Sequence, residues 1–73
     1  MNLPEMIPVS SSNIESIGYD EPNQQVILKF LNGSLYSYKG VPIHEYENLL
    51  LAPSCGSYLH RNFKNVYPYE RIG

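Results

Sequence analysis

Tryptophan is absent from this 73-residue chain, and cysteine occurs only once. The single thiol, Cys55, cannot close an internal disulfide, so we expect the protein to work in a reducing compartment. No apolar run is long enough to span a bilayer, and the polar start of the chain is unlike a secretory signal peptide. The sequence therefore predicts a cytoplasmic protein without membrane association.

Charged side chains are also few, at 16% of the residues, and the formal net charge is −2. This balance argues against simple electrostatic capture of nucleic acid. The charge is uneven, however, because residues 1–28 contain four acidic residues and no lysine or arginine. Residues 57–73 carry Arg61, Lys64 and Arg71 against Glu70 alone. The C-terminal end is therefore locally basic on an acidic molecule.

Residue patterns typical of catalysis and metal binding are sparse. The sequence has no glycine-rich phosphate loop, and two histidines with one cysteine are too few and too scattered for a structural zinc site. Cys55 with His44 or His60 could serve as a thiol nucleophile and its base, but no third group at a telling spacing orients them. We therefore expect a non-enzymatic protein with no metal and no cofactor.

Apolar residues make up 42% of the chain, which is typical of a folded protein, and the length leaves room for one domain. We expect residues 1–8, with Pro4 and Pro8, to form an extended arm and residues 9–73 to form the domain. Seven tyrosines are unusual in so short a chain. Tyrosine joins a large apolar ring to a polar tip, which suits half-buried surfaces and binding faces.

The strongest local signal lies in residues 25–42. Asn32-Gly33 between two apolar runs predicts a hairpin with a two-residue turn, in which Phe30 pairs with Leu35 and Ile27 with Tyr38. Because side chains alternate across a strand, this register divides the hairpin into two faces. The expected core face carries Val26, Leu28, Phe30 and Leu35. The expected open face carries Ile27, Lys29, Leu31, Tyr36 and Tyr38.

The flanking segments complete the predicted fold. Residues 14–20 form a strand in which Gly18 marks a bulge or a close backbone approach, and a turn at 20–23 joins it to the hairpin. One helix has Pro42 as its first residue and ends before Pro53, with an inward side that includes Ile43 and Leu49. A second helix is capped by Ser54, with Leu59, Phe63 and Val66 as its inward stripe. We expect an α+β fold: a three-stranded antiparallel meander, two short helices packed on one face, and an extended C-terminal segment along a sheet edge.

Several of these segments, taken in order, resemble the KTSC domain, which is named after a C-terminal segment of some lysyl-tRNA synthetases. The resemblance covers nearly the whole chain from Val9 onward, and each piece alone is weak. Its main pieces are Val9 to Ile14, Gly18-Tyr19-Asp20, Phe30 to Gly33, Tyr36-Ser37-Tyr38, Gly40-Val41-Pro42, Ala52, Ser54, Gly56, Tyr58-Leu59-His60 and Tyr67-Pro68-Tyr69.

The resemblance implies a free-standing small bacterial or phage member of that family, and its synthetase context suggests RNA binding. The sequence departs from the family pattern at His60, where asparagine is common, and at Phe63-Lys64, where an isoleucine–arginine pair is common. The missing arginine bears on the RNA hypothesis, because arginine binds phosphate as a planar fork and lysine only as a point charge.

Two groups of residues are candidates for binding. Tyr36 and Tyr38 could form a platform on which bases stack, with Lys29 and Lys39 beside it for phosphates. The basic cluster of His60, Arg61, Lys64 and Arg71 could bind phosphate near a helix. Each group also has a purely structural explanation. The tyrosines could be packed under a helix, and the basic cluster could be the solvated flank of a helix. A capped helix start at residues 54–57 could also hold an anion, although an ordinary cap explains it.

The partner that the sequence favours is therefore RNA. The alternative is a protein partner or self-association through an exposed tyrosine patch, since tyrosine is enriched in interface hot spots and acidic net charge is no obstacle there.

Overall fold

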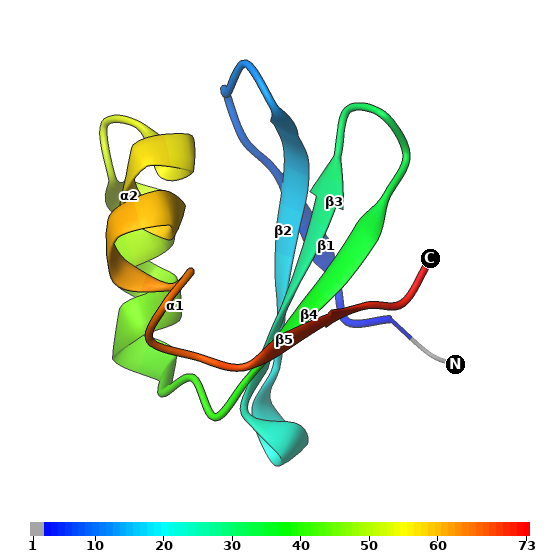
Figure 1. The fold of residues 1–73 in the computed structure, drawn as a ribbon, viewed down its shortest axis with the longest axis vertical. Coiled ribbons are helices and arrows are strands. Elements are labelled where there is room, and N and C mark those ends of the chain that lie inside the picture. The colour runs from blue at the N-terminus through cyan, green and yellow to red at the C-terminus, as the bar shows by residue number, and fades with distance from the viewer. Residues whose placement is uncertain (1–2) are drawn as a thin grey trace.

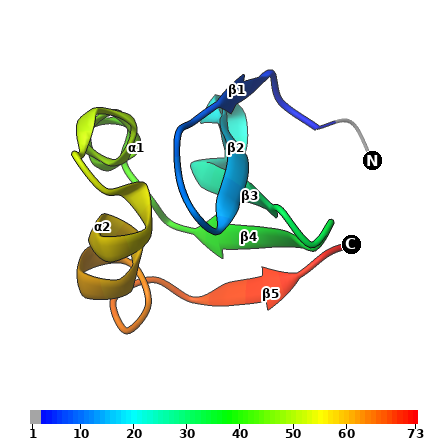
Figure 2. The ribbon, with the colours of Figure 1, turned by 90° about the horizontal axis from the view of Figure 1, so that it is seen from above.

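The computed structural model describes residues 3–73, which form an antiparallel sheet with two helices on one of its faces (Figures 1 and 2). The elements follow in the order β1 (Met6–Pro8), β2 (Ile14–Asp20), a short 3-10 turn (Glu21–Asn23), β3 (Gln25–Phe30), β4 (Leu35–Lys39), α1 (Ile43–Leu51), α2 (Cys55–Asn62) and β5 (Tyr69–Arg71). The five strands lie in sequence order across the sheet. The α+β class is confirmed, but the expected number of three strands is wrong.

The two additional strands are short edge strands. β1 lies in the segment expected as an extended arm, of which residues 1 and 2 fall outside the described part, and it pairs with β2 so that Ile7 is opposite Ile17. β5 follows Pro68 and pairs with β4, which gives the C-terminal segment the sheet-edge position that its proline indicated. Both strands have only three residues, so neither has enough periodicity to predict it from sequence.

The hairpin register differs from the expectation by one residue. Gly33, with φ of +90°, lies in the left-handed region, and the Phe30 N–H donates to the Ser34 carbonyl over 2.9 Å, so the loop has three residues. Leu28 consequently pairs with Tyr36, and Val26 with Tyr38. A one-residue slip moves every side chain of a strand to the other face.

This slip exchanges the contents of β4 between the two faces. Tyr36 and Tyr38 lie on the helix-covered face, together with the side chains of Val26 and Leu28. Leu35 pairs with Lys29 on the face away from the helices. The expected placement of the tyrosines on an open face is therefore wrong, and so is that of Leu35 in the core.

The core fills the space between the sheet and the helices. Phe63, rather than Phe30, is its largest fully buried side chain; Phe30 is only partly buried at its margin. α2 ends at Asn62, so Val66 is not on the helix and is 61% exposed, contrary to the predicted inward stripe. The buried residues of the cluster are Ile14, Ile17, Val26, Leu28, Tyr38, Val41, Leu49, Cys55, Leu59 and Phe63.

Proline and serine set the helix limits close to the predicted positions. α1 starts at Ile43, one residue later than expected, because Pro42 is its extended N-cap, and it stops at Leu51, where Ala52 turns extended before Pro53. The Ser54 hydroxyl caps α2 by accepting a hydrogen bond of 3.3 Å from the Ser57 N–H. The start of α2 is thereby fixed next to the loop that joins β1 to β2, which positions the site described below.

Candidate functional site

Three hollows lie side by side along α2, between this helix and the end of the sheet that carries the 9–13 and 31–34 loops. We call the three together the α2 groove, and name them the serine pocket, the middle hollow and the aromatic pocket. The serine pocket and the middle hollow share Asn13, Gly56 and His60. The middle hollow and the aromatic pocket share Phe30, Tyr38 and Lys64.

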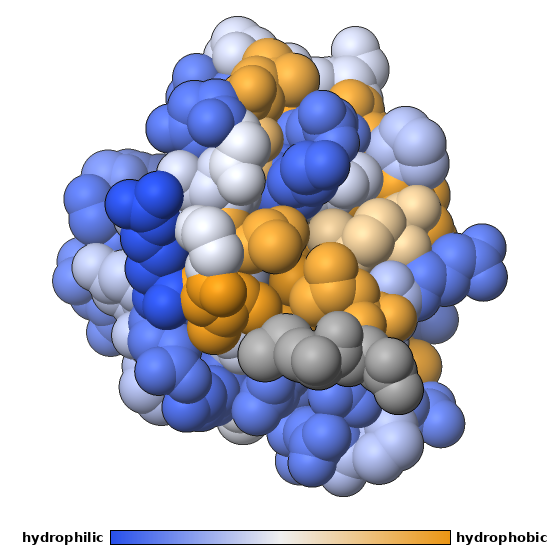
Figure 3. Space-filling view, turned by 90° about the vertical axis from the view of Figure 1, so that its right-hand side faces the viewer, coloured by the Kyte–Doolittle hydropathy of each residue, from blue (hydrophilic) through white to orange (hydrophobic). Residues whose placement is uncertain are grey.

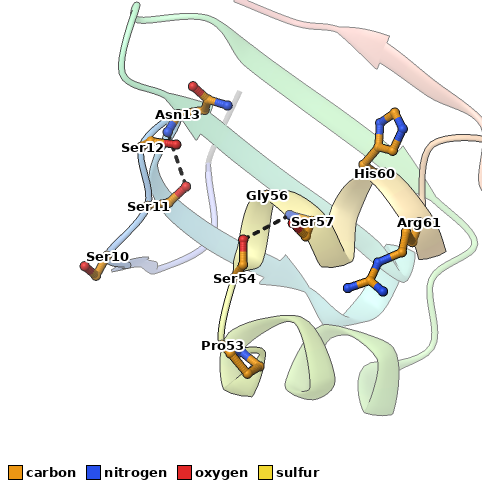
Figure 4. A pocket seen from close by; sticks show the side chains of 10 residues that line it. All are labelled: Ser10, Ser11, Ser12, Asn13, Pro53, Ser54, Gly56, Ser57, His60 and Arg61. Carbon is orange, nitrogen blue, oxygen red and sulfur yellow. Dashed lines mark hydrogen bonds between the residues drawn. The ribbon is translucent and has the colours of Figure 1, made fainter.

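The serine pocket, of about 620 Å³, is the wide end of the groove. Figure 4 shows Ser11 and Ser12 of the β1–β2 loop across from Ser54 and Ser57 at the start of α2. The Ser11 hydroxyl accepts hydrogen bonds of 3.3 Å from the N–H groups of Asn13 and Ile14, which fixes the loop. The full lining is Ser10, Ser11, Ser12, Asn13, Pro53, Ser54, Gly56, Ser57, His60 and Arg61.

The aromatic pocket, of about 310 Å³, is the opposite end. The ring of Tyr36 meets that of Phe30 edge-on at 5.5 Å, and the ring of Tyr69 lies 6.1 Å from that of Tyr36. These contacts hold together one aromatic residue from each of three neighbouring strands, all on the face of the sheet that carries the helices. The lining comprises Phe30, Asn32, Ser34, Tyr36, Tyr38, Lys64 and Tyr69.

The groove is basic although the protein is acidic. His60, Arg61 and Lys64 are all exposed along it. Among the residues that line the three hollows, none is aspartate or glutamate within the described chain. The acidic residues lie elsewhere: in the segment before β1, in β2, at the 20–21 turn, in α1 and in β5. Charge is thus segregated, and an anion entering the groove meets no carboxylate in its lining.

The predicted site residues divide between the two faces of the sheet. Lys29 and Lys39 lie on the face away from the helices, where Lys29 pairs with Glu15 at 3.3 Å and Lys39 with Glu70 at 2.8 Å. They therefore do not flank Tyr36 and Tyr38, and their expected position beside a tyrosine platform is wrong.

The two predicted tyrosines have different environments. Tyr38 is only 6% exposed, and its ring contacts the ring of Phe63 edge-on at 5.7 Å. Burial raises the pKa of the Tyr38 hydroxyl, and the neighbouring Tyr69 and Tyr36 raise it further. Tyr36 is half-buried and lines the aromatic pocket. Tyr38 is therefore packed in the core, as the structural explanation expects, whereas Tyr36 stays accessible.

Arg71 joins the groove side of the molecule, because it is paired with Tyr36 across β4 and β5. Its Nε donates to the Gly73 carbonyl over 3.0 Å. Sequence reasoning missed Tyr69, Phe30 and Asn32 as pocket residues. A partial signal for Tyr69 was present, since an extended segment along a sheet edge was expected there, but the side chains of β4 were assigned to the wrong face.

The lone thiol is hydrogen-bonded to the backbone of α1. Cys55 is buried in the core, and its Sγ donates to the Leu49 carbonyl over 3.3 Å. Within residues 3–73, no group of three or more histidine, cysteine, aspartate or glutamate side chains is placed to hold a metal ion.

The face of the sheet away from the helices has a different character. Figure 3 looks onto this side and shows apolar side chains gathered at its centre. Leu3, Ile27 and Ile72 line a hollow of about 340 Å³ here, bordered by Lys39 and Glu70. None of the helices in the described chain has the length and apolarity that crossing a membrane requires.

Comparison with known proteins identifies close relatives of this chain. A protein of Stutzerimonas stutzeri is 40% identical over 68 residues, covering 90% of this chain and 94% of its own length. A lysine–tRNA ligase of Nostoc sp. is 34% identical over 67 residues, which cover 92% of this chain but only 12% of the ligase. This chain thus spans a small part of the ligases that it matches.

A solved structure of similar fold also matches nearly the whole chain. The crystal structure of a KTSC domain protein from Yersinia pestis superposes with a TM-score of 0.87 at 37% identity, over 94% of this chain and 97% of that one. The KTSC domain profile matches residues 10–67, which include every strand and helix of the fold except β1 and β5. The protein therefore belongs to the KTSC domain family.

Proposed function

We propose that this KTSC domain is a non-enzymatic nucleic-acid-binding module, that RNA is its ligand, and that the α2 groove is its binding surface. The observation that carries the proposal is the placement of His60, Arg61 and Lys64 along a groove that also holds accessible aromatic rings and no lining carboxylate. Cationic side chains beside aromatic faces are the usual means of binding single strands. The similarity to lysine–tRNA ligases supports RNA over DNA.

The roles of the groove residues follow from their chemistry. Arg61 and Lys64 supply positive charge for phosphates, and Arg71 adds to it beyond the aromatic pocket. Tyr69, which is 50% exposed, offers part of its ring for stacking, worth about 1–3 kcal/mol per base. Because α2 is short, the charges lie close together and suit a short stretch of backbone.

The test is a titration of fluorescently labelled single-stranded RNA at several salt concentrations, followed by anisotropy. With about three phosphates neutralised, log affinity should fall against log salt with a slope of about −2. Lys64→Ala should weaken binding at low salt and make the slope shallower by about 0.7.

Lys29→Ala is the matched control, because Lys29 is a half-exposed lysine that lies on the opposite face and is paired with Glu15. Its affinity and slope should equal those of the unmodified protein. Equal losses in the two variants would remove the groove from the proposal. Absence of binding at low salt would remove the function itself.

An alternative function is self-association through the apolar sheet face opposite the helices. Leu3 is 42% exposed there, and the bordering Lys39–Glu70 pair offers both signs of charge, so a second copy related by a two-fold axis can place lysine opposite glutamate. The expected tyrosine patch does not form this surface. Sedimentation should then show a mass that rises with concentration, and Leu3→Glu should suppress that rise. A constant monomer mass would exclude this alternative.

A further inference from the structure

The aromatic pocket contains a polar group whose orientation is fixed by the backbone. The Oδ1 atom of Asn32 accepts a hydrogen bond of 2.9 Å from the Ser34 N–H. A backbone N–H can only donate, so the carboxamide oxygen must face it, and the Nδ2 group must point the other way. Among the described residues no acceptor is paired with Nδ2, and Asn32 lines the pocket.

The size of the pocket restricts what can occupy it. A volume of about 310 Å³ is at the lower end of the range for small-molecule sites, which suits one planar ring system. A base can enter only if its faces are free of neighbours, so a paired base in a duplex cannot. The molecule measures 27 × 24 × 20 Å, which is too short to follow the roughly 16 base pairs that duplex-RNA domains span.

Resting on the proposed function, we infer that the aromatic pocket holds one unpaired base of a single strand and that Asn32 selects uracil, which has a carbonyl at position 4, over cytosine, which has an amino group there. The rings of Phe30, Tyr36 and Tyr69 provide apolar contact for any base. Asn32 Nδ2 provides a donor, which matches the carbonyl at position 4 of uracil and conflicts with the amino group at the same position of cytosine. The Lys64 ammonium, at the pocket and on the neighbouring hollow, holds a flanking phosphate.

The experiment compares labelled oligouridine and oligocytidine of about eight nucleotides, a length within the footprint of small single-strand modules. Uracil and cytosine have the same ring size and differ at position 4, a carbonyl against an amino group, and at N3, an N–H donor against an acceptor. The unmodified protein should bind oligouridine about five times more tightly, as expected for one base-edge hydrogen bond replaced by a mismatch.

Asn32→Asp keeps the oxygen that accepts from Ser34 and replaces the Nδ2 donor by an acceptor. It should weaken binding to both oligonucleotides through its charge, and it should abolish or reverse the preference for uridine. Lys64→Ala should weaken both equally and leave the ratio unchanged, because a phosphate contact carries no base information.

The outcomes separate the inference from the proposed function. Equal binding of the two oligonucleotides, or tighter binding of oligocytidine, overturns the base selection while the groove function stands. An unchanged uridine preference in Asn32→Asp overturns the role of Asn32. Absence of binding to both oligonucleotides at low salt overturns the function and the inference together.

Discussion

At the scale of single residues, Gly18 shows how the lack of a side chain in one strand lets the neighbouring strand lie close. It lies in β2 opposite Met6 of β1. A Cβ atom at this position would be 2.6 Å from the Met6 sulfur and 2.9 Å from the backbone carbonyl oxygen of Glu5. The flexible Met6 side chain can move away, but the Glu5 carbonyl belongs to the chain leading into β1. Of the two readings of Gly18 from sequence, close backbone approach is confirmed, and the register irregularity lies instead between Ile14 and Ser16.

We therefore predict that Gly18→Ala displaces β1 and lowers the free energy of unfolding by about 1–3 kcal/mol. Urea denaturation followed by circular dichroism measures this change. Gly56→Ala is the matched control, because Gly56 lies in α2 and the nearest atom to its added Cβ is Ser11 Oγ at 4.0 Å. This second variant should be neutral or up to about 1 kcal/mol more stable, since alanine favours the helix. Equal stabilities of the two variants would show that β1 yields without cost.

At the scale of elements, the sequence predicts the helices better than the sheet. Both helix starts depend on residues whose effect is local: Pro42 at one, and the Ser54 cap at the other. β3 and β4 were also located correctly. Their pairing was not, because Asn-Gly fits either a two-residue turn or the last two positions of a three-residue loop. That choice depends on tertiary packing, since only the longer loop brings Tyr38 under Phe63.

The candidate site followed the same division. The basic cluster was readable as a group, because His60, Arg61 and Lys64 are close together in the sequence at the end of α2. The position of the tyrosines depended on the strand register, which was wrong by one residue. Lys29 and Lys39 were therefore expected beside Tyr36 and Tyr38, although they lie on the opposite face. Asn32 could not be recognised as a site residue, because as a turn residue its side chain has an ordinary structural role. Only the position of its loop beside the aromatic pocket makes Asn32 a candidate for a binding role as well.

At the scale of the whole molecule, tyrosines do much of the packing that a larger core would supply. In a chain of 73 residues the buried fraction of the surface is limited to roughly 60%, so each large ring matters. Tyr19 stacks on Tyr46 with ring centroids 5.1 Å apart, and its hydroxyl donates to the Val41 carbonyl over 2.7 Å. Tyr58 donates to Glu45 over 3.1 Å and so ties α2 to α1. One neutral hydroxyl thus ties β2 to the segment before α1, and another ties α2 to α1.

The pKa of several tyrosines is accordingly raised in the folded protein. Burial is the largest cause for Tyr19, with the charges of Glu21 and Asp20 adding to it. Burial also comes first for Tyr58, followed by its hydrogen bond to Glu45. The remaining tyrosines with a raised pKa are Tyr38, Tyr46 and Tyr67. In the unfolded chain all of these ionise near their ordinary pKa of about 10.

The protein should therefore lose stability in alkaline solution. A group whose pKa is higher in the folded state binds its proton more tightly there, so its contribution is intact below pH about 10 and is lost as pH rises through the higher folded values. The free energy of unfolding, measured by urea denaturation across this range, should fall steeply above pH about 10. Tyr38→Phe should make the fall shallower, because it removes one buried ionisable group while keeping the ring against Phe63. A free energy that stays level as the tyrosines ionise would show that their hydroxyls reach water in the folded state, and the packing role argued for them would be wrong.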